Sequence, residues 1–177
     1  MSKVYIIADP HINHINLAVN YRGFASIEEH DELIISNWNK IVTKRDKVFV
    51  LGDLAMKRTA IETFGKLNGS KVLIGGNHDE PKHFEEILKY FDKVQGCLKY
   101  DNCILTHIPI HESCIERFDF NIHGHIHGGL IKTTVYNNEL GKSEVINDPR
   151  YINVSCEHIN YTPILFEELL NKRRNEK

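Results

Sequence analysis

The sequence predicts an α/β domain with a mixed sheet, or two packed sheets, flanked by helices. Two observations lead to this prediction. In the first half of the chain, short apolar runs alternate with stretches of helical pattern, whereas the second half consists mostly of apolar runs typical of strands. The 177 residues show no internal repeat, linker or low-complexity segment, so we expect residues 1–177 to form a single domain.

The strands are predicted by short runs rich in β-branched and aromatic residues. The polar stretch 137–148 carries a glycine and is expected to be an exposed hairpin or loop. The expected strands cover residues 3–8, 47–51, 71–74, 94–100, 102–106, 118–122, 130–136 and 151–155.

The clearest helix signal is a capping box formed by Ser26 and Glu29. In this motif the serine side chain caps the first turn, and the glutamate reaches back to the serine N–H. Apolar residues, among them Trp38, then recur at helical spacing, which predicts a helix with one buried face. Shorter helices are expected at 60–67 and 81–90, and a last one at 163–174.

Composition limits the possible functions. Hydrophobic residues make up 41% and charged residues 26%, as in soluble globular proteins. A net charge of −2 gives no broad basic surface for nucleic acid. No apolar run approaches the roughly 18 residues of a membrane span, and no signal segment precedes the first strand. The four cysteines lack zinc-finger spacing, so we expect a cytoplasmic protein with reduced thiols.

Five apolar runs end in residues that can bind metal ions. Side chains at the carboxyl ends of neighbouring strands converge on one edge of a sheet. Their nitrogen and oxygen donors suit Mn²⁺, Fe²⁺ or Zn²⁺, and they outnumber the ligands of one ion, so two ions are predicted. Two such ions can bind a phosphoryl group and lower the pKa of a shared water. The donors are Asp9, His11, Asp53, Asn77, His78, His107, His125 and His127.

Each of these residues also has a purely structural interpretation. Asp53 could be a turn residue or a helix cap, Asn77 a left-handed turn residue and His107 a loop histidine. His125 and His127 could alternate on a half-exposed strand. The ordered series of five strand ends favours the metal-ligand interpretation for all of them.

The ordered set resembles the calcineurin-like metallophosphoesterases. It contains Asp9-x-His11, Gly52-Asp53, Gly76-Asn77-His78-Asp79, His107 and Gly124-His125-Ile126-His127. The Asp-x-His-x-x-His-x-Asn opening and the stretch from Asn153-Val154-Ser155 to Tyr161-x-Pro163 are similar to a compact single-domain bacterial and phage branch. The resemblance implies a four-layer αββα sandwich, in which two mixed β-sheets pack face to face and helices flank them.

The resemblance also implies the ligands of two divalent transition-metal ions. One ion would be held by Asp9, His11, Asp53 and His127, and the other by Asp53, Asn77, His107 and His125, with Asp53 bridging. Mn²⁺ is the ion we expect, and Fe²⁺, Zn²⁺ or Ni²⁺ would fit the same donors.

In the mechanism that the family implies, a metal-bridging hydroxide attacks the phosphorus in line. His78 would protonate the leaving oxygen or stabilise the developing charge. Asp79 would orient His78 through a hydrogen bond. His14 and Asn16 could reach the substrate phosphate or form an ordinary capped turn. His123 alternates with His125 and is therefore expected on the same side, in contact with substrate.

Departures from related families indicate the kind of ester. Protein Ser/Thr phosphatases of this superfamily carry Gly-Asp-x-x-Asp-Arg-Gly, but here Lys57 takes the place of the phosphate-binding arginine, with Arg58 next to it. Lysine gives no bidentate grip on phosphate. A site with few fixed cations favours a singly charged diester over a dianionic monoester.

We therefore expect a phosphodiesterase for a small or nucleotide-like diester. Three alternatives stay open: a phosphomonoesterase, a single-strand nuclease with the same metal site, and a binding scaffold without catalysis. The 137–148 segment could close over the site or form a dimer contact, and the sequence predicts no oligomeric state.

Overall fold

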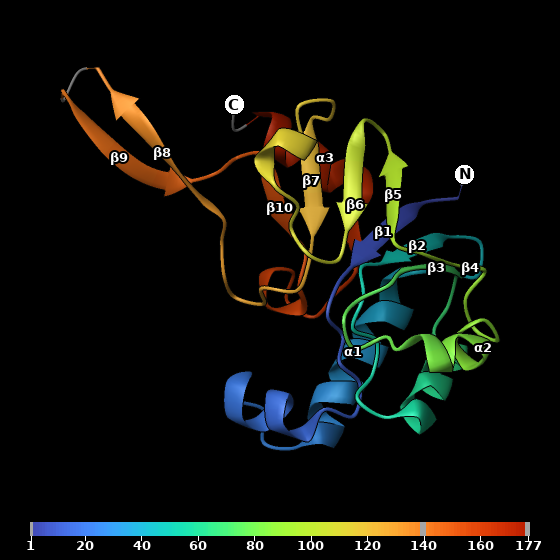
Figure 1. Ribbon diagram of the computed structural model, residues 1–177. Helices are drawn as coiled ribbons and strands as arrows, with labels where there is room; N and C mark the ends of the chain where they lie inside the picture. Colours follow the sequence, from blue (N-terminus) through green and yellow to red (C-terminus); the bar gives the residue numbers. More distant parts are fainter. Residues whose placement is uncertain (1, 139–140, 176–177) are drawn as a thin grey trace.

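Two mixed sheets form the centre of the computed structural model, which describes residues 2–138 and 141–175 (Figure 1). The larger sheet contains β1 (Val4–Ile7), β2 (Lys47–Val50), β3 (Ser70–Ile74), β4 (Lys93–Gln95) and β11 (Ile164–Leu165). Their order is β11-β1-β2-β3-β4, and only β11 is antiparallel to its neighbour. The carboxyl ends of β1, β2 and β3 therefore lie at one edge of the sheet.

The second sheet has the strand order β10-β7-β6-β5. It contains β5 (Cys97–Tyr100), β6 (Cys103–Thr106), β7 (Phe120–His123) and β10 (Tyr151–Asn153). The central strands β6 and β7 are parallel, so they also end side by side.

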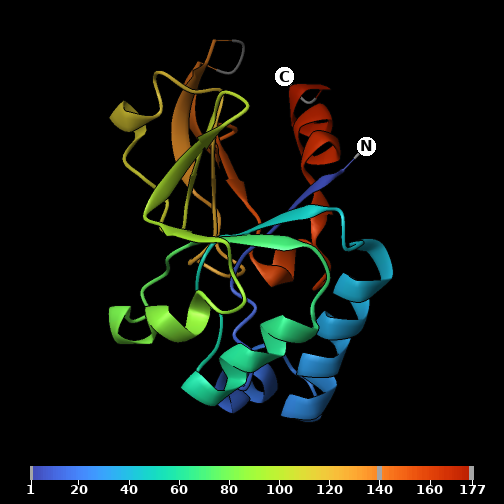
Figure 2. The same cartoon turned by 90° about the vertical axis from the view of Figure 1, so that its right-hand side faces the viewer.

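The two sheets share one apolar core. The ring of Phe49 on β2 lies 4.9 Å from the ring of Tyr100 on β5, and Tyr100 lies 4.9 Å from Phe166. Phe166 begins the final helix, α3 (Phe166–Asn175), which contacts β1 and β11. Helix α1 (Ile27–Ile41) lies on the other side of the larger sheet (Figure 2). The predicted fold class, with two mixed sheets and helices outside them, is confirmed.

Helix α1 begins where the capping box predicts. The Ser26 Oγ accepts a hydrogen bond from the Glu29 N–H, at 3.2 Å. The Glu29 carboxylate accepts from the Ala25 N–H at 2.8 Å, one residue before the position that the motif predicts. Trp38 is fully buried and donates from its indole nitrogen to the Asn68 carbonyl oxygen. No helix in the described ranges is long and apolar enough to cross a membrane.

Three predicted segments take a different form. Residues 94–100 are not one strand, because the chain passes from β4 in one sheet to β5 in the other at Gly96. The predicted helix 60–67 is a 3₁₀ helix, Arg58–Lys66, whose Gly65 lies against the Tyr90 ring. The predicted helix 81–90 is a 3₁₀ turn, Pro81–His83, followed by α2 (Phe84–Ile87).

Two short elements lie outside the predicted pattern. A π-helix, Leu17–Tyr21, lies in a stretch for which the sequence predicts neither a helix nor a strand. Strand β11 takes the first residues of the predicted final helix, and pairs with β1. Both depend on tertiary contacts, which a periodic pattern in the sequence does not record.

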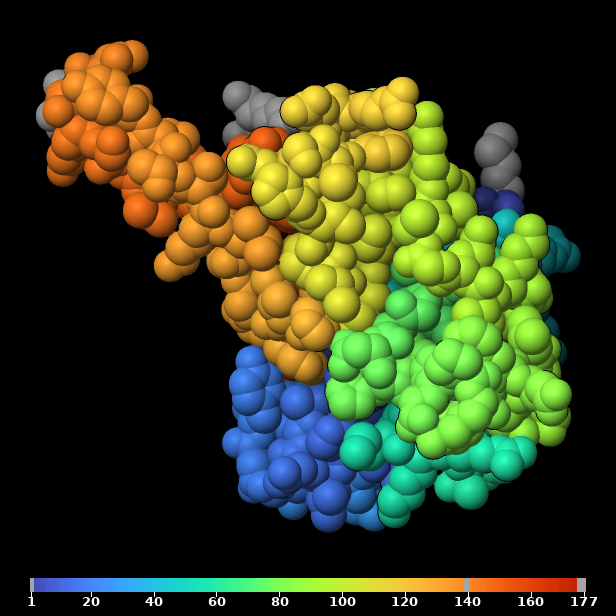
Figure 3. Space-filling model, in the orientation of Figure 1, coloured from blue at the N-terminus to red at the C-terminus, as the bar shows by residue number. Residues whose placement is uncertain are grey.

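The stretch after residue 130 forms a hairpin of β8 (Lys132–Asn137) and β9 (Lys142–Asn147), so the predicted strand 130–136 supplies its first strand and the predicted hairpin or loop 137–148 contains its second. Residues 139–140 of the predicted 137–148 segment lie outside the described residues. The two strands pair with each other in a separate two-stranded sheet. The hairpin projects away from the body of the molecule and from the strand ends that carry the candidate ligands (Figures 1 and 3).

Candidate metal centre

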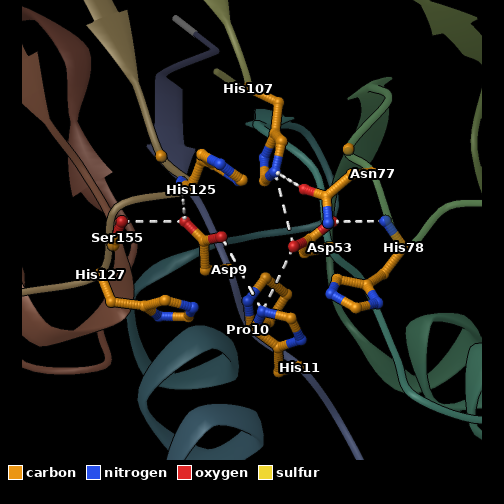
Figure 4. Close-up of polar contacts among 12 residues, drawn as sticks. Asp9, Pro10, His11, Asp53, Asn77, His78, His107, His125, His127 and Ser155 are labelled. Atoms are coloured by element: carbon orange, nitrogen blue, oxygen red, sulfur yellow. Dashed lines mark hydrogen bonds and ion pairs between the residues drawn. The ribbon is translucent and has the colours of Figure 1, made fainter. Parts of the chain in front are cut away.

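The predicted ligands from five separate strand ends meet in one place (Figure 4). They enter from the loops after β1, β2, β3, β6 and β7, at the edge where the parallel strands end. The structure forms two groups of three, and in each group one ligand atom per residue lies within 4.8 Å of the others. The groups are Asp9, His11 and His127, and Asp53, His107 and His125.

Asp53 joins the two groups. Its Oδ2 lies 3.4 Å from His11 Nε2 in the first group and 3.5 Å from His107 Nε2 in the second. Asn77 stands beside the second group, with its Oδ1 2.9 Å from His107 Nε2. The two candidate ligand groups therefore meet at the Asp53 carboxylate.

The first group contains buried polar atoms that make no hydrogen bond to the described residues. Asp9 Oδ1 and both ring nitrogens of His11 have no hydrogen bond to any described residue. Buried groups of this kind cost free energy unless something pairs with them. The other Asp9 oxygen accepts from Ser155 Oγ at 2.8 Å and from the His125 N–H at 2.9 Å, so the carboxylate is held in a fixed orientation. A divalent cation fits this donor set.

The surroundings of Asp9 and Asp53 move the pKa values of these two carboxylates apart. Burial raises the pKa of Asp9 to about 6, and burial lowers the pKa of His11 to about 3. Burial also acts to raise the pKa of Asp53, but hydrogen bonding and attraction from His107, with the His78 N–H, outweigh it and bring the pKa to about 2. Asp53 is therefore ionised at neutral pH and ready to bind cations.

The backbone of the ligands has an unusual conformation. A positive φ is uncommon for residues other than glycine, and such strain gathers at functional sites. Five of the ligands have it: Asp9 (56°), His11 (48°), Asp53 (56°), His125 (70°) and His127 (47°).

Two motif glycines allow the carboxylates to come close. A Cβ atom at Gly76 would lie 2.3 Å from Asp53 Oδ1, and one at Gly124 would lie 2.3 Å from Asp9 Oδ2. Both distances are far shorter than a van der Waals contact. The glycines before Asn77 and His125 are therefore part of the centre, because no side chain fits there.

Asp79 has a different role from the predicted one. Its carboxylate accepts from the N–H groups of Asp53 and Gly76, both at 2.8 Å, and of Leu54 at 3.0 Å. Both oxygens are thus occupied, and no hydrogen bond joins Asp79 to His78 in the described part of the chain. The expectation that Asp79 orients His78 is corrected: Asp79 ties the loop after β2 to the loop after β3.

His78 lies on the exposed side of the centre. Its N–H donates to Asp53 Oδ1 at 2.9 Å, and its ring centre lies 5.5 Å from that of His11. The ring is exposed to solvent, where an incoming ester could reach it.

His14 and Asn16 line a cavity of about 530 Å³ together with His125 and His127. His14 also accepts a hydrogen bond from the Leu17 N–H through Nδ1, at 3.2 Å, so it both caps a turn and faces the cavity. The predicted contact of these two residues with a substrate phosphate stays a prediction.

His123 does not face this cavity. Its side chain is only 1% exposed, its ring packs against Tyr151, and burial lowers its pKa to about 4. The alternation with His125 ends at Gly124, where the chain leaves β7 and turns. The predicted substrate contact of His123 is therefore corrected to a place in the core.

Sequence reasoning missed a group of residues behind the ligands. Glu157 Oε1 lies 2.9 Å from His127 Nδ1, and Arg22 Nε donates to the same oxygen at 2.8 Å. Arg22 also donates to the Asp9 carbonyl oxygen, and its other guanidinium nitrogen lies 2.7 Å from His30 Nε2. His30, on helix α1, is fully buried. Among the residues that hold the candidate ligands in place, only Ser155 belongs to a stretch that the sequence analysis singled out, Asn-Val-Ser.

Comparisons with known proteins agree with the motifs. A family model described as calcineurin-like phosphoesterase matches residues 2–176. An uncharacterised protein of Methanocaldococcus jannaschii is 35% identical over 171 residues, which cover 93% of this chain and 87% of that protein. The gene 66 protein of Mycobacterium phage D29 is 28% identical over 170 residues, with 77% of this chain and 84% of that protein covered.

A solved structure shows the same fold. The crystal structure of a protein of unknown function from Aquifex aeolicus superimposes with a TM-score of 0.69 and 24% identity, covering 97% of this chain and 100% of that one. The family model spans all of the described residues, including every member of the two candidate ligand groups. This chain therefore belongs to the calcineurin-like phosphoesterase family.

Proposed function

We propose that this protein is a dinuclear-metal-dependent phosphodiesterase that hydrolyses a small or nucleotide-like diester. The observation that carries the proposal is the position of Asp53 Oδ2 between His11 of one ligand group and His107 of the other. In this proposal Asp9, His11, Asp53 and His127 hold one ion, and Asp53, Asn77, His107 and His125 hold the second. Mn²⁺ is the ion we expect.

Two such ions, when bound, neutralise charge on the phosphoryl oxygens and lower the pKa of a water that becomes the nucleophile. The chain supplies the rest. Ser155 and the His125 N–H fix the Asp9 carboxylate, and the His78 N–H fixes Asp53, so the ligands are preorganised. The exposed His78 ring donates a proton to the leaving ester oxygen.

The charge around the site favours a diester over a monoester. The residues that line the cavity beside the ligands, all within the described ranges, include no lysine and no arginine. Arg22 is near, but its guanidinium is buried and committed to Glu157 and to the Asp9 carbonyl. A monoester dianion carries two negative charges and would find no cationic side chain on this surface to attract it. A diester carries one negative charge, which the ions can neutralise.

The test compares two chromogenic esters with a common leaving group. Protein stripped with a chelator and reloaded with Mn²⁺ is assayed with bis(p-nitrophenyl) phosphate and with p-nitrophenyl phosphate, with Asp53→Asn as the inactive control. We expect Mn²⁺-dependent cleavage of the diester that Asp53→Asn abolishes. Fast cleavage of the monoester alone would overturn the diester preference, and no cleavage with Mn²⁺, Fe²⁺, Zn²⁺ or Ni²⁺ would favour a binding scaffold.

A further inference from the structure

The cavity beside the ligands has one wall that belongs to no motif. The π-helix Leu17–Tyr21 forms this wall, and the loop after β7, with Ile126, forms the opposite one. In the space-filling view the N-terminal segment that carries this helix meets the segment around residues 125–130 at the surface (Figure 3). A volume of about 530 Å³ lies within the range of small-molecule sites, about 300–1,000 Å³.

The π-helix is held rigidly against the metal centre. Its characteristic bond runs from the Arg22 N–H to the Leu17 carbonyl oxygen, at 2.9 Å. Arg22, directly after the helix, is anchored by Glu157 and by the Asp9 carbonyl oxygen. At the start of the helix, His14 accepts from the Leu17 N–H. Single π-helical turns of this kind are rare in proteins as a whole, and many of those known lie at functional sites.

Tyr21 is displayed over the cavity and is held at its hydroxyl end. Its side chain is 58% exposed, although its ring centre lies 5.6 Å from that of the ligand His127. The hydroxyl accepts from the Gly128 N–H at 3.4 Å, which fixes the ring across the gap between the two walls. Tyr21 is not among the described side chains that pack against the core, and a planar ligand group placed against the ring would cover it.

The chemical character of the walls specifies the ligand group. Leu17, Tyr21 and Ile126 are apolar, and Asn16 and Asn20 offer amide groups. Of the described residues that line the cavity, none is a lysine, arginine, aspartate or glutamate. An uncharged aromatic ring with polar edges suits such walls, since rings of any base can stack on an aromatic side chain and amides can bond their edges.

We propose that this cavity binds the nucleobase of a nucleotide diester. The base stacks on the Tyr21 ring, and this contact selects a nucleotide over a phosphate ester that has no base. The inference builds on the proposed function, because the phosphate must occupy the metal centre for the base to reach Tyr21. It adds a base-binding site formed by the π-helix, next to the ligands His125 and His127.

The test measures binding with two phosphate probes that differ in the base. Adenosine 5′-monophosphate and ribose 5-phosphate are titrated calorimetrically into Mn²⁺-loaded protein. Tyr21→Ala should weaken binding of the adenosine probe by roughly 5- to 150-fold, the effect of losing one stacked base, and leave that of ribose 5-phosphate unchanged. Tyr21→Phe keeps the ring and should keep the affinity.

Tyr136→Ala is the matched control, because Tyr136 is similarly exposed but lies on the distant hairpin strand β8. Melting curves of each variant establish that it is folded. Equal binding of the two probes by the native protein would overturn the base site while leaving diester hydrolysis untouched. Equal weakening of both probes by Tyr21→Ala would also overturn it, because Tyr21 would then act on His127. Binding of neither probe would overturn the base site, and an absence of diester hydrolysis in addition would remove the proposed function as well.

Discussion

Glu157 Oε1 lies 2.9 Å from His127 Nδ1, so Nε2 is the nitrogen of this ring that would bind a metal ion. The same glutamate oxygen accepts from Arg22, so His127 is tied through Glu157 to the buried guanidinium. Burial acts to raise the pKa of Glu157, but His127 and Arg22 outweigh it and bring the pKa to about 2, so the carboxylate is ionised. Carboxylates behind a histidine ligand fix its tautomer and raise its basicity.

Replacing Glu157 should therefore weaken one of the two ion sites. We expect Glu157→Gln to lower Mn²⁺ affinity by about 10- to 100-fold at one site and to leave the other site close to native. Calorimetric titration with Mn²⁺ resolves the two. Glu62→Gln, on the exposed face of the 3₁₀ helix Arg58–Lys66, serves as the control. Unchanged affinity at both sites would show that Glu157 does not support His127.

Asp79 should matter for stability, because its carboxylate binds three backbone N–H groups. We expect Asp79→Asn to lower the free energy of unfolding by about 2–4 kcal/mol, since hydrogen bonds to a charged group contribute about 1.5–3 kcal/mol each. Urea denaturation measures it, with the exposed Asp101→Asn as control. If Asp79→Asn changes the free energy of unfolding by less than about 0.5 kcal/mol and shifts the pH–rate profile of ester hydrolysis, Asp79 orients His78 after all.

A side chain at Gly124 should damage the first ion site without changing any ligand. The added Cβ in Gly124→Ala would meet Asp9 Oδ2 and the Ala8 side chain, at 2.3 and 2.5 Å, so Asp9 must move. We expect Mn²⁺ affinity to fall at least about tenfold, because ligand geometry tolerates little displacement. Gly96→Ala is the control, since nothing lies within 4 Å of its Cβ position. Equal affinities in the two variants would contradict this account.

The pH dependence of stability can be tested at Asp46, far from the ions. Its carboxylate accepts from the Lys3 and Thr43 N–H groups, which lower its pKa below the ordinary value. A lowered carboxyl pKa stabilises the fold above the unfolded-state pKa of about 3.9 and ceases to do so as pH falls below it. Asp46→Asn should thus be destabilising at pH 7, and its deficit should shrink towards pH 3. A deficit that does not change with pH would refute the ionic role.

The sequence predicted where the candidate ligands meet, because each stands at the end of an apolar run. Parallel strands place such ends together, so Asp9, Asp53 and His107 converge without any knowledge of side-chain contacts. The same logic failed for His123, because alternation along a strand does not extend past a glycine turn. It failed for Asp79 because neighbours in sequence need not be partners in space.

The supporting residues could not be predicted, since their contacts span the chain. Glu157 meets Arg22 across 135 residues, and neither belongs to a periodic pattern or a motif. The π-helix is set by such tertiary anchors rather than by the hydrophobic period of residues 17–21. The passage from β4 to β5 at Gly96 likewise depends on which sheet each half can join.

The most direct test of the central claim counts ions. Native protein and Asp53→Asn, each stripped with a chelator, are equilibrated with Mn²⁺, separated from free ion and analysed for bound metal by mass spectrometry. The shared position of Asp53 predicts two Mn²⁺ per native chain and one or none in Asp53→Asn. A native chain that saturates with one ion, or an Asp53→Asn chain that keeps both at native affinity, would contradict a two-ion centre built on Asp53.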